Sequence, residues 1–301
     1  MKVLFATDGS REAVAAASLA CQFLPRAGLE ADAVCVVPEF LPAMTGWDDR
    51  RLRERYLRQM EGETNRILGD VVGALAGAGV RVRPMARAGS PAGALVDLAR
   101  DYDMVVLGSR GRRDAGDVGI GPVASHVAHH ASCSVFVGRG SPAASDPHIL
   151  AAVDGSTPSL RAMAVLASLI DIDNAEITLM HVMETPWLHL GLEQEWFGYE
   201  DSAHEAIDPE ARWQRRLRVE AERVVERARD AIGSPHPGIE RKIAEGLPAN
   251  EVLSEAELGG YDLVVMGATG ASDLKHQMLG SVTLRIASQA PCPVLIIRPR
   301  D

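Results

Sequence analysis

The chain has 301 residues, a length that accommodates two ordinary domains. With 47% hydrophobic and 24% charged residues it can bury sizeable cores, which argues against a disordered chain. Only 4% of the residues are aromatic, so aliphatic side chains must build the interior, and this suits helices packed on a sheet. The formal net charge is −10, whereas domains that bind nucleic acid through phosphates are usually basic, so no nucleic-acid partner is expected.

The excess of negative charge lies entirely in the second half of the chain. Residues 1–146 hold 17 basic and 17 acidic residues, and residues 147–301 hold 14 and 24. The four scattered cysteines are too few for a disulfide framework or a zinc site of CxxC type, and are expected to be buried reduced thiols. The absence of a signal-like segment and of a long apolar span predicts a cytoplasmic protein with no membrane partner.

An internal repeat organises the sequence. The segment Val3–Ser10 (VLFATDGS) is echoed by Ile149–Ser156 (ILAAVDGS), and Asp103–Gly111 (DMVVLGSRG) is echoed by Asp262–Gly270 (DLVVMGATG). These segments are 146 and 159 residues apart, too far for a solenoid repeat, which indicates a duplicated domain. Most of the extra length of the second unit is expected around Trp187–Asp208.

Strand-like and helix-like patterns alternate along both units. The first unit predicts, in chain order, strand 2–7, helix 12–23, strand 32–37, helix 49–77, strand 80–86, helix 91–100, strand 103–108, helix 122–130 and strand 133–138. The second unit predicts strand 149–153, helix 158–171, strand 176–182, helix 209–232, strand 239–244, helix 248–258, strand 262–267, helix 281–289 and strand 293–298.

The predicted fold class is α/β. Strands such as Met104–Leu107 are apolar at every position, which indicates a mainly parallel sheet buried on both faces. Each unit is therefore expected to be a sandwich in which helices flank a five-stranded sheet. We assign the first domain to residues 1–140 and the second to residues 148–301, with the Ser, Pro and Ala-rich stretch 141–147 as the linker.

Informative residues follow two strands of each unit, and ligands of open parallel sheets bind beyond the carboxyl ends of the strands. An Asp-Gly-Ser sequence follows the first strand of each unit, at 8–10 and at 154–156. A glycine-rich loop follows the fourth strand of each unit. These four places predict where a ligand would bind.

The loop of the second unit reads Gly267-Ala-Thr-Gly270, then nine residues, then Gly280-Ser281 at the start of a helix. Glycines let the backbone approach a phosphate chain without a Cβ in the way, and a helix N-terminus attracts anions. The Ser281 hydroxyl suits a phosphate oxygen or a metal. Alternatively, Gly267 only ends a strand, Gly270 turns a loop and Ser281 caps a helix. The position of the pattern in a duplicated α/β unit favours a nucleotide.

This signature, G-x-x-G, nine residues and G-[S/T] after Val264–Gly267, resembles the ATP-binding signature of the universal stress protein family. The opening segment 149–156, the strand end Met180–Met183 and the tail 280–298 are also similar to that family's consensus. The chain is therefore similar to a tandem universal stress protein, with the weakest match at 187–208. The resemblance implies a Rossmann-like fold of the adenine nucleotide alpha hydrolase type in both units.

The resemblance implies ATP as the ligand, with ADP and AMP as alternatives, and bound magnesium whose protein ligands are unknown. It places Asp154 at the ribose hydroxyls, for which an acceptor-only carboxylate is suited, and the Val182 backbone at the adenine. Met266 and Gly267 would flank the nucleoside. Four residues would surround the phosphates: Gly270, Gly280, Ser281 and Val282. The alternative for Asp154 is a turn residue that binds its own downstream amides.

The first unit departs from the family pattern. Its corresponding residues are weaker candidates: Asp8, Val36, Gly108, Gly111 and Gly121. Pro122 stands where the family has serine or threonine, which removes a hydroxyl and an amide donor from the phosphate cradle, so binding is expected to be weaker or lost. Arg110, Arg112 and Arg113 either add positive charge to this site or are simply solvated.

Other patterns fit known sites less well. The segment Gly119–Ala124 fits G-x-G-x-x-A but begins too far after its strand for a dinucleotide fingerprint, and no P-loop occurs. His126, His129 and His130 lie at helical spacing, which fits a metal site or, more simply, a helix surface.

No Ser-His-Asp arrangement or nucleophile elbow is visible, so any ATPase activity is expected to be slow. Lys275 and His276, in the second glycine-rich loop, either reach a terminal phosphate or are exposed loop residues. The helix at Arg212–Asp230 alternates Arg and Glu about an apolar stripe, which fits a solvated face or a partner surface.

The resemblance implies a nucleotide-dependent regulatory module of the stress response that acts on an unidentified protein partner. It also implies that the two units pack through their last strands and that chains pair into homodimers. Two other classes stay open. One is an enzyme that hydrolyses ATP or adenylylates a substrate, with Glu193, Glu195 or His189 as acid or base. The other is an interaction scaffold that binds no nucleotide.

Overall fold

The computed structural model describes nine stretches of the chain: 1–25, 27–37, 50–112, 119–140, 146–173, 175–184, 209–233, 238–270 and 279–300. Within them, each unit has the five strands and four α-helices that the sequence predicts. Residues 141–145 of the predicted linker lie outside the described stretches.

Both units alternate strands and helices in the same order. The elements of the first unit are β1 (Lys2–Thr7), α1 (Arg11–Phe23), β2 (Glu30–Val37), α2 (Arg50–Gly77), β3 (Val82–Ala88), α3 (Pro91–Leu98), the 3-10 turn η2 (Ala99–Asp101), β4 (Met104–Gly108), α4 (Pro122–His130) and β5 (Ser134–Gly138). Those of the second are β6 (His148–Ala152), α5 (Thr157–Leu169), β7 (Glu176–Met183), α6 (Pro209–Ile232), β8 (Ile239–Glu245), α7 (Pro248–Leu258), β9 (Leu263–Gly267), α8 (Ser281–Gln289) and β10 (Val294–Ile297).

The predicted bounds differ from these by at most two residues. The helix predicted at 91–100 ends at Leu98, because the chain tightens there into the 3-10 turn Ala99–Asp101 before β4 begins. The predicted α/β class is confirmed.

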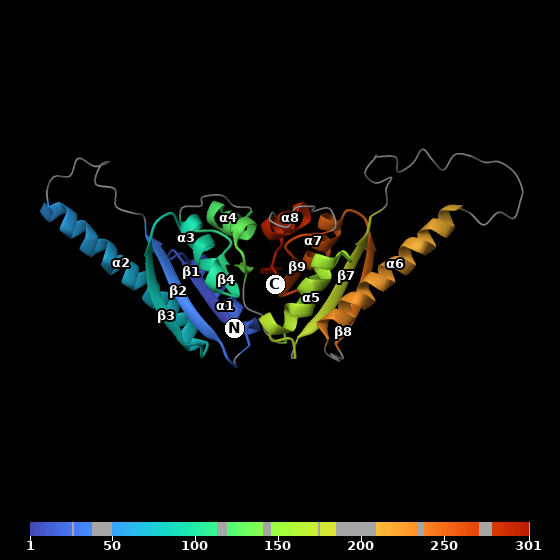
Figure 1. The fold of residues 1–301 in the computed structure, drawn as a ribbon, viewed down its shortest axis with the longest axis horizontal. Coiled ribbons are helices and arrows are strands. Elements are labelled where there is room, and N and C mark those ends of the chain that lie inside the picture. Colours follow the sequence, from blue (N-terminus) through green and yellow to red (C-terminus); the bar gives the residue numbers. More distant parts are fainter. Residues whose placement is uncertain are drawn as a thin grey trace, which may run out of the picture.

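The strands form a single ten-stranded sheet in the order β3-β2-β1-β4-β5-β10-β9-β6-β7-β8. Neighbouring strands are parallel throughout, except at the centre, where β5 and β10 run antiparallel with Leu295 opposite Phe136. The expected packing of the two units through their last strands is therefore confirmed. Figure 1 shows the units side by side, with α2 and α6 at the two outer ends.

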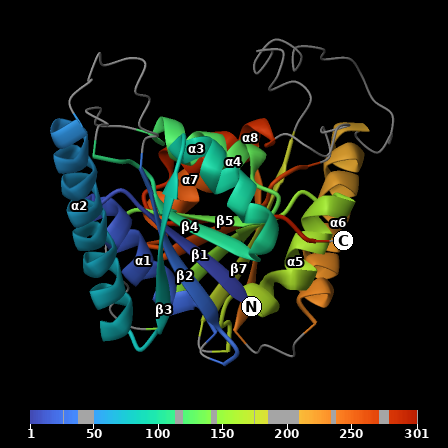
Figure 2. The ribbon, with the colours of Figure 1, turned by 60° about the vertical axis from the view of Figure 1, so that its left-hand side comes forward.

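Helices cover both faces of the sheet, as the turned view in Figure 2 shows. Helices α1, α2, α5 and α6 share one apolar core with the sheet, and α3, α4, α7 and α8 share the other. Each core contains residues of both units, so the two domains share their interior. The four central strands, β4, β5, β10 and β9, are buried at every position, which explains why they carry no polar side chain except Ser134 at the start of β5.

All four cysteines are free and buried, which confirms the predicted thiols. Burial raises the pKa of both Cys133 and Cys292 to about 11.

In the described part of the chain, no helix is both long and apolar enough to cross a membrane.

Candidate functional site

The predicted site residues gather where the strand order of each unit reverses. From β1 the chain continues outward to β2 and β3, and then returns to β4 on the other side of β1. The second unit does the same with β6, β7, β8 and β9. Such a reversal leaves a crevice at the carboxyl ends of the two central strands, and Asp8 and Asp154 follow the first strand of each pair.

A tight turn directs each of these aspartates. Gly9 and Gly155 have φ of +79° and +78°, a conformation that favours glycine. A Cβ there would lie 2.7 Å from Cγ1 of Ile67 in α2, or 2.6 Å from Cγ2 of Val224 in α6. Glycine therefore allows the long outer helix to pack directly on the turn.

The serine after each glycine begins the next helix. The Ser10 hydroxyl accepts a hydrogen bond from the Ala13 amide at 3.1 Å, and the Ser156 hydroxyl accepts one from Ser159 at 3.3 Å. Both are N-caps, so the Asp-Gly-Ser sequence has a structural role in α1 and α5 as well as placing the aspartate.

The two carboxylates divide their oxygens between the turn and the glycine-rich loop. Oδ1 of Asp154 accepts the Ser156 amide at 2.9 Å, so the turn role considered for this residue is real. Its Oδ2 points to the other loop, since a Cβ on Gly270 would lie 2.4 Å from it. In the first unit, Asp8 accepts the Ser10 amide at 2.9 Å and the Arg112 amide at 2.7 Å.

The glycine-rich loop is tied to the start of the following helix in both units. The Gly280 amide donates to the Ala268 carbonyl at 2.9 Å, and the Gly121 amide donates to the Ser109 carbonyl at 2.7 Å. In the second unit, the Thr283 hydroxyl also donates to the Gly267 carbonyl at 3.0 Å. The first turn of α4 and of α8 is therefore held beside the end of the fourth strand.

Gly280, not Ser281, is the N-cap of α8, so the helix-capping alternative for Ser281 is wrong. Ser281 is the first helical residue and is exposed, and Val282 beside it is half-buried. A glycine N-cap offers no side chain to the free amides of the first turn, which leaves them to bind water or an anion.

The remaining second-unit candidates lie on neighbouring strands of the same sheet. Val182 is near the end of β7, and Met266 is near the end of β9, on either side of β6. Both belong to the core shared by α7 and α8. Lys275, His276 and the candidates His189, Glu193 and Glu195 lie outside the described residues.

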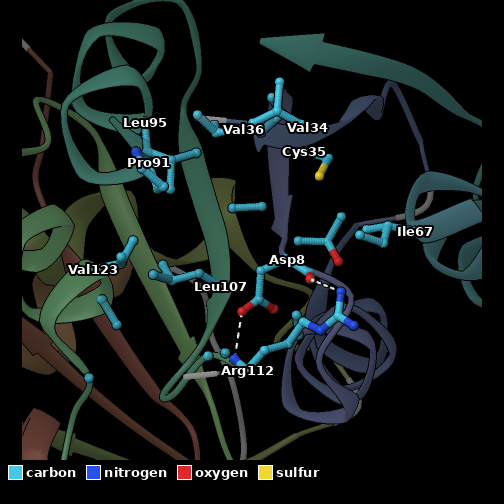
Figure 3. Close-up of a pocket in the computed structure, with 18 of the residues that line it drawn as sticks. Asp8, Val34, Cys35, Val36, Ile67, Pro91, Leu95, Leu107, Arg112 and Val123 are labelled. Atoms are coloured by element: carbon cyan, nitrogen blue, oxygen red, sulfur yellow. Dashed lines mark hydrogen bonds between the residues drawn. The ribbon is translucent and has the colours of Figure 1, made fainter. Parts of the chain in front are cut away.

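The first unit contains a pocket of about 570 Å³ at this place (Figure 3). It is lined by all five first-unit candidates: Asp8, Val36, Gly108, Gly111 and Gly121. Its walls are mainly aliphatic, including Val34, Leu95, Leu107 and Val123. The volume and the few polar groups are typical of a small-molecule site.

Helix α2 contributes pocket residues that the sequence reasoning missed, notably Met60, Glu63, Thr64 and Ile67. The sequence does mark Glu63, because the pattern Glu63-x-x-Arg66 recurs as Glu220-x-x-Arg223 in the second unit. Both pairs form ion pairs in the structure, at 2.9 Å and 3.3 Å.

Arg112 links the pocket loop to α2. Its guanidinium contacts Oε1 of Glu63 at 3.3 Å and its own backbone amide binds Asp8. Hydrogen bonds from Arg66 first, and then from Arg112, lower the pKa of Glu63 to about 2. Arg110 also lines the pocket, so two of the three predicted arginines are at the site, and Arg113 lies outside the described residues.

The histidines of α4 interact with one another and with the backbone of their own helix. The rings of His126 and His130 lie 4.5 Å apart, and Nδ1 of His129 is 2.7 Å from the Ser125 carbonyl. Among the described residues, no group of three His, Cys, Asp or Glu side chains is arranged to hold a metal ion.

Comparison with known proteins agrees with this geometry. The universal stress protein family model matches residues 1–139 and 147–298. A universal stress protein of Mycolicibacterium smegmatis is 26% identical over 313 residues, covering 99% of this chain and 97% of the relative. Universal stress protein YxiE of Bacillus subtilis is 31% identical over 150 residues, covering 50% of this chain and 97% of the relative.

A solved universal stress protein from Archaeoglobus fulgidus shares the fold, with a TM-score of 0.63 at 18% identity, covering 100% of this chain and 97% of that one. The two family matches account for nearly the whole sequence, one for each half of the sheet. The chain therefore belongs to the universal stress protein family and carries two of its domains in tandem.

Proposed function

We propose that the second unit binds an adenine nucleotide, with ATP as the first candidate, in the crevice beyond β6 and β9. One observation carries the proposal. In the first unit, Asp8 and all three glycines of the motif line a single pocket, and the second unit repeats the scaffold of that pocket around Asp154, Gly270 and Gly280. The proposed domains are residues 1–140 and 148–301.

The nucleoside would lie between the first and fourth strands of the second unit. The Asp154 carboxylate would accept hydrogen bonds from the ribose hydroxyls, as an acceptor-only group does. Val182 and Met266 would offer backbone and apolar side-chain contacts to the adenine, and Gly267 would allow the ribose to approach the strand end.

The phosphates would bind at the first turn of α8, where Gly280 leaves backbone amides without a side-chain cap. Gly270 keeps the loop backbone close to the same point, and Ser281 and Val282 complete the turn. Magnesium bound to ATP neutralises phosphate charge and is typically held largely by phosphates and water, to which the exposed Ser281 hydroxyl adds one suitable oxygen.

In the first unit we propose the same placement with a weaker phosphate site. The pocket at Asp8, Val36 and Gly108 is large enough for a nucleoside, but Pro122 begins α4 and supplies neither an amide nor a hydroxyl. Arg110 and Arg112 at the pocket add positive charge that compensates in part.

We infer a regulatory module with little or no ATPase activity. Both oxygens of Asp8 accept backbone amides, which suits a positioning role better than that of a general base. Nucleotide binding would change the surface that meets a protein partner or a second copy of the chain. An enzyme and a nucleotide-free scaffold are the competing functions.

Titration of nucleotide-stripped protein with Mg-ATP, Mg-ADP and AMP tests the proposal. A panel with cAMP is informative too, because one solved universal stress protein is described as a complex with cAMP. Asp154→Ala and Gly280→Val should each weaken ATP binding at least tenfold, since each removes a charged or close backbone contact. The matched changes Asp8→Ala and Gly121→Val should matter less.

The same preparations separate the competing functions. A scaffold predicts that no nucleotide binds and that Gly280→Val changes nothing. An enzyme predicts phosphate or pyrophosphate release with multiple turnovers, which Asp154→Ala abolishes. The regulatory module predicts binding without appreciable turnover.

A further inference from the structure

Arg139, directly after β5 of the first unit, reaches the last turn of α8 in the second unit. Its Nη1 donates to the carbonyls of Ser288 at 2.9 Å and Ala290 at 3.0 Å, and its Nη2 donates to the carbonyl of Ala287. The Ala287 carbonyl has no helical partner, because the residue four positions on is Pro291, which lacks an amide hydrogen. An arginine from the first unit therefore caps the C-terminal end of a helix in the second unit.

Arg298, directly after β10, makes the reciprocal contact. Its Nη2 donates to the carbonyls of Ala128 at 2.7 Å and His129 at 3.2 Å, in the last turn of α4. The two arginines are 159 residues apart, the same offset that relates the glycine-rich loops. The antiparallel pairing of β5 and β10 explains the exchange, because it carries each strand's carboxyl end past the other unit's helix.

The environment of both guanidiniums is unusual for a cation. Arg139 Nε and Arg298 Nη1 are fully buried without a hydrogen-bond partner, and in the described part of the chain neither arginine forms an ion pair with a carboxylate. Burial lowers the pKa of both side chains. Their positive charge is therefore balanced by helix carbonyls, whose dipoles are negative at that end.

The proposed phosphate site of each unit lies at the N-terminal end of the helix whose C-terminal end the arginine binds. Helix α8 runs from Gly280 and Ser281 to the carbonyls that Arg139 holds, and α4 runs from Gly121 and Pro122 to those that Arg298 holds. Nine residues make a rod about 13 Å long, so a displacement of its last turn also moves its first.

We propose that Arg139 and Arg298 are positioning residues that make the nucleotide site of each unit depend on the other unit. The proposal rests on the proposed function for its nucleotide readout, but the helix displacement is measured without any ligand. It predicts a crossed pattern, in which a substitution in the first unit weakens the site of the second.

The affinity test uses Arg139→Met, which keeps an unbranched apolar stem and removes the charge and the donors. In an Asp8→Ala background, where only the second site is retained, Arg139→Met should weaken Mg-ATP binding about three- to tenfold. Arg298→Met should change it less than twofold. Arg139→Lys, which keeps the charge without the planar fork, should be intermediate.

Loss of charge alone is controlled by Arg285→Met, because Arg285 is an exposed residue of α8 whose guanidinium donates to Gln289 of the same helix. Equal weakening by Arg285→Met and Arg139→Met would overturn the proposal, and so would unchanged affinity in Arg139→Met. Circular dichroism and the urea midpoint verify that each variant is folded.

Residue-resolved hydrogen exchange decides the proposal if no nucleotide binds and the proposed function fails. The Gly280 amide is hydrogen-bonded to the Ala268 carbonyl, and the Leu284 and Ala290 amides are hydrogen-bonded to the carbonyls of Gly280 and Ile286, so the three amides report on the two ends of α8. Arg139→Met should speed exchange at all three, and Arg298→Met should instead act on Gly121, Ser125 and Ala131 in the first unit. Faster exchange at Ala290 alone would show that Arg139 stabilises only the last turn of α8. That result would overturn the proposed coupling between the two units.

Discussion

The Asp154 carboxylate fills the space that a side chain at residue 270 would need, since a Cβ on Gly270 would lie 2.4 Å from Oδ2 of Asp154. This relationship joins the loop after β6 to the loop after β9, which are more than a hundred residues apart in sequence. It explains why residue 270 is a glycine, because the backbone there passes directly beside the carboxylate.

Gly270→Ala should therefore separate stability from binding. The clash involves only the tip of the Asp154 side chain, which can rotate away, so the melting temperature should change by less than about 2 °C. ATP affinity should fall at least fivefold, because the rotated carboxylate no longer faces the ribose. Calorimetric titration and thermal unfolding measure both. Unchanged ATP affinity would show that Asp154 does not contact the nucleotide.

Pro122→Ser should strengthen nucleotide binding in the first unit. The substitution restores one amide and one hydroxyl at the start of α4, where proline supplies neither. Binding to an Asp154→Ala variant, which leaves only the first site, should tighten by about fivefold or more with Mg-ATP and hardly at all with adenosine. Equal gains for ATP and adenosine would contradict a phosphate contact.

Gly138→Ala should destabilise the fold. A Cβ at Gly138, the last residue of β5, would lie 2.3 Å from Cβ and 2.6 Å from Cα of Ala16, so α1 would have to move off the sheet. Overpacking of this kind costs about 1 to 3 kcal/mol of the free energy of unfolding. The urea midpoint should fall, and the slope of the transition should not change.

Gly73→Ala is the matched control for Gly138→Ala. Gly73 is in α2, and nothing lies within 4 Å of an added Cβ. Because alanine favours the helix, the free energy of unfolding should rise by about 0.5 to 1 kcal/mol. A loss of stability in this variant would mean that the outer helix packs differently.

All four cysteines should resist alkylation in the native protein. They are buried, and a pKa of about 11 for Cys133 and Cys292 leaves little thiolate at pH 8. Mass spectrometry after iodoacetamide treatment should find no adduct on the native chain and four on the unfolded chain. Rapid modification of Cys35, which lines the first-unit pocket, would show that the pocket opens.

The Glu63 carboxylate should remain ionised in acid. Its pKa in the folded chain is about 2, below the ordinary value of 4.5, because Arg66 and Arg112 donate hydrogen bonds to it. A lowered pKa favours the folded state above about pH 4.5, and this contribution is lost as the pH falls toward 2. The carboxyl ¹³C shift of Glu63 should therefore still be that of the ionised form at pH 4.

Two substitutions test why the pKa of Glu63 is lowered. Arg66→Ala should raise the pKa of Glu63 more than Arg112→Ala does, because Arg66 makes the stronger hydrogen bonds to it. A midpoint near 4.5 in the wild-type chain would contradict the bridge between the pocket loop and α2.

The repeat and the local patterns were sufficient to predict the strands and helices. An apolar strand such as β4, or the Asp-Gly-Ser turn before α1, can be predicted from the local sequence alone. Because the domain is duplicated, each pattern occurs twice and supports the same assignment in both units. The carboxyl-end rule then placed Asp8 and Asp154 beside the glycine-rich loops, which the structure confirms as geometry. Their ligand stays a prediction.

The parts that could not be predicted depend on packing between distant segments. Glu63 faces the pocket only because α2 packs on the turn at Gly9, and the repeated Glu-x-x-Arg pattern marks the residue without indicating that contact. Arg139 and Arg298 follow their strands and read as ordinary polar residues in the sequence. Their role in completing a helix of the other unit follows only from the antiparallel pairing of β5 and β10.

The central claim is that the second unit holds the stronger nucleotide site. Calorimetric titration of the nucleotide-stripped chain with Mg-ATP, read for stoichiometry, tests it most directly. We expect one tight site per chain, lost in Asp154→Ala and kept in Asp8→Ala. Two equal sites would show that Pro122 is tolerated and contradict the asymmetry, and no heat of binding with any adenine nucleotide would contradict nucleotide binding itself.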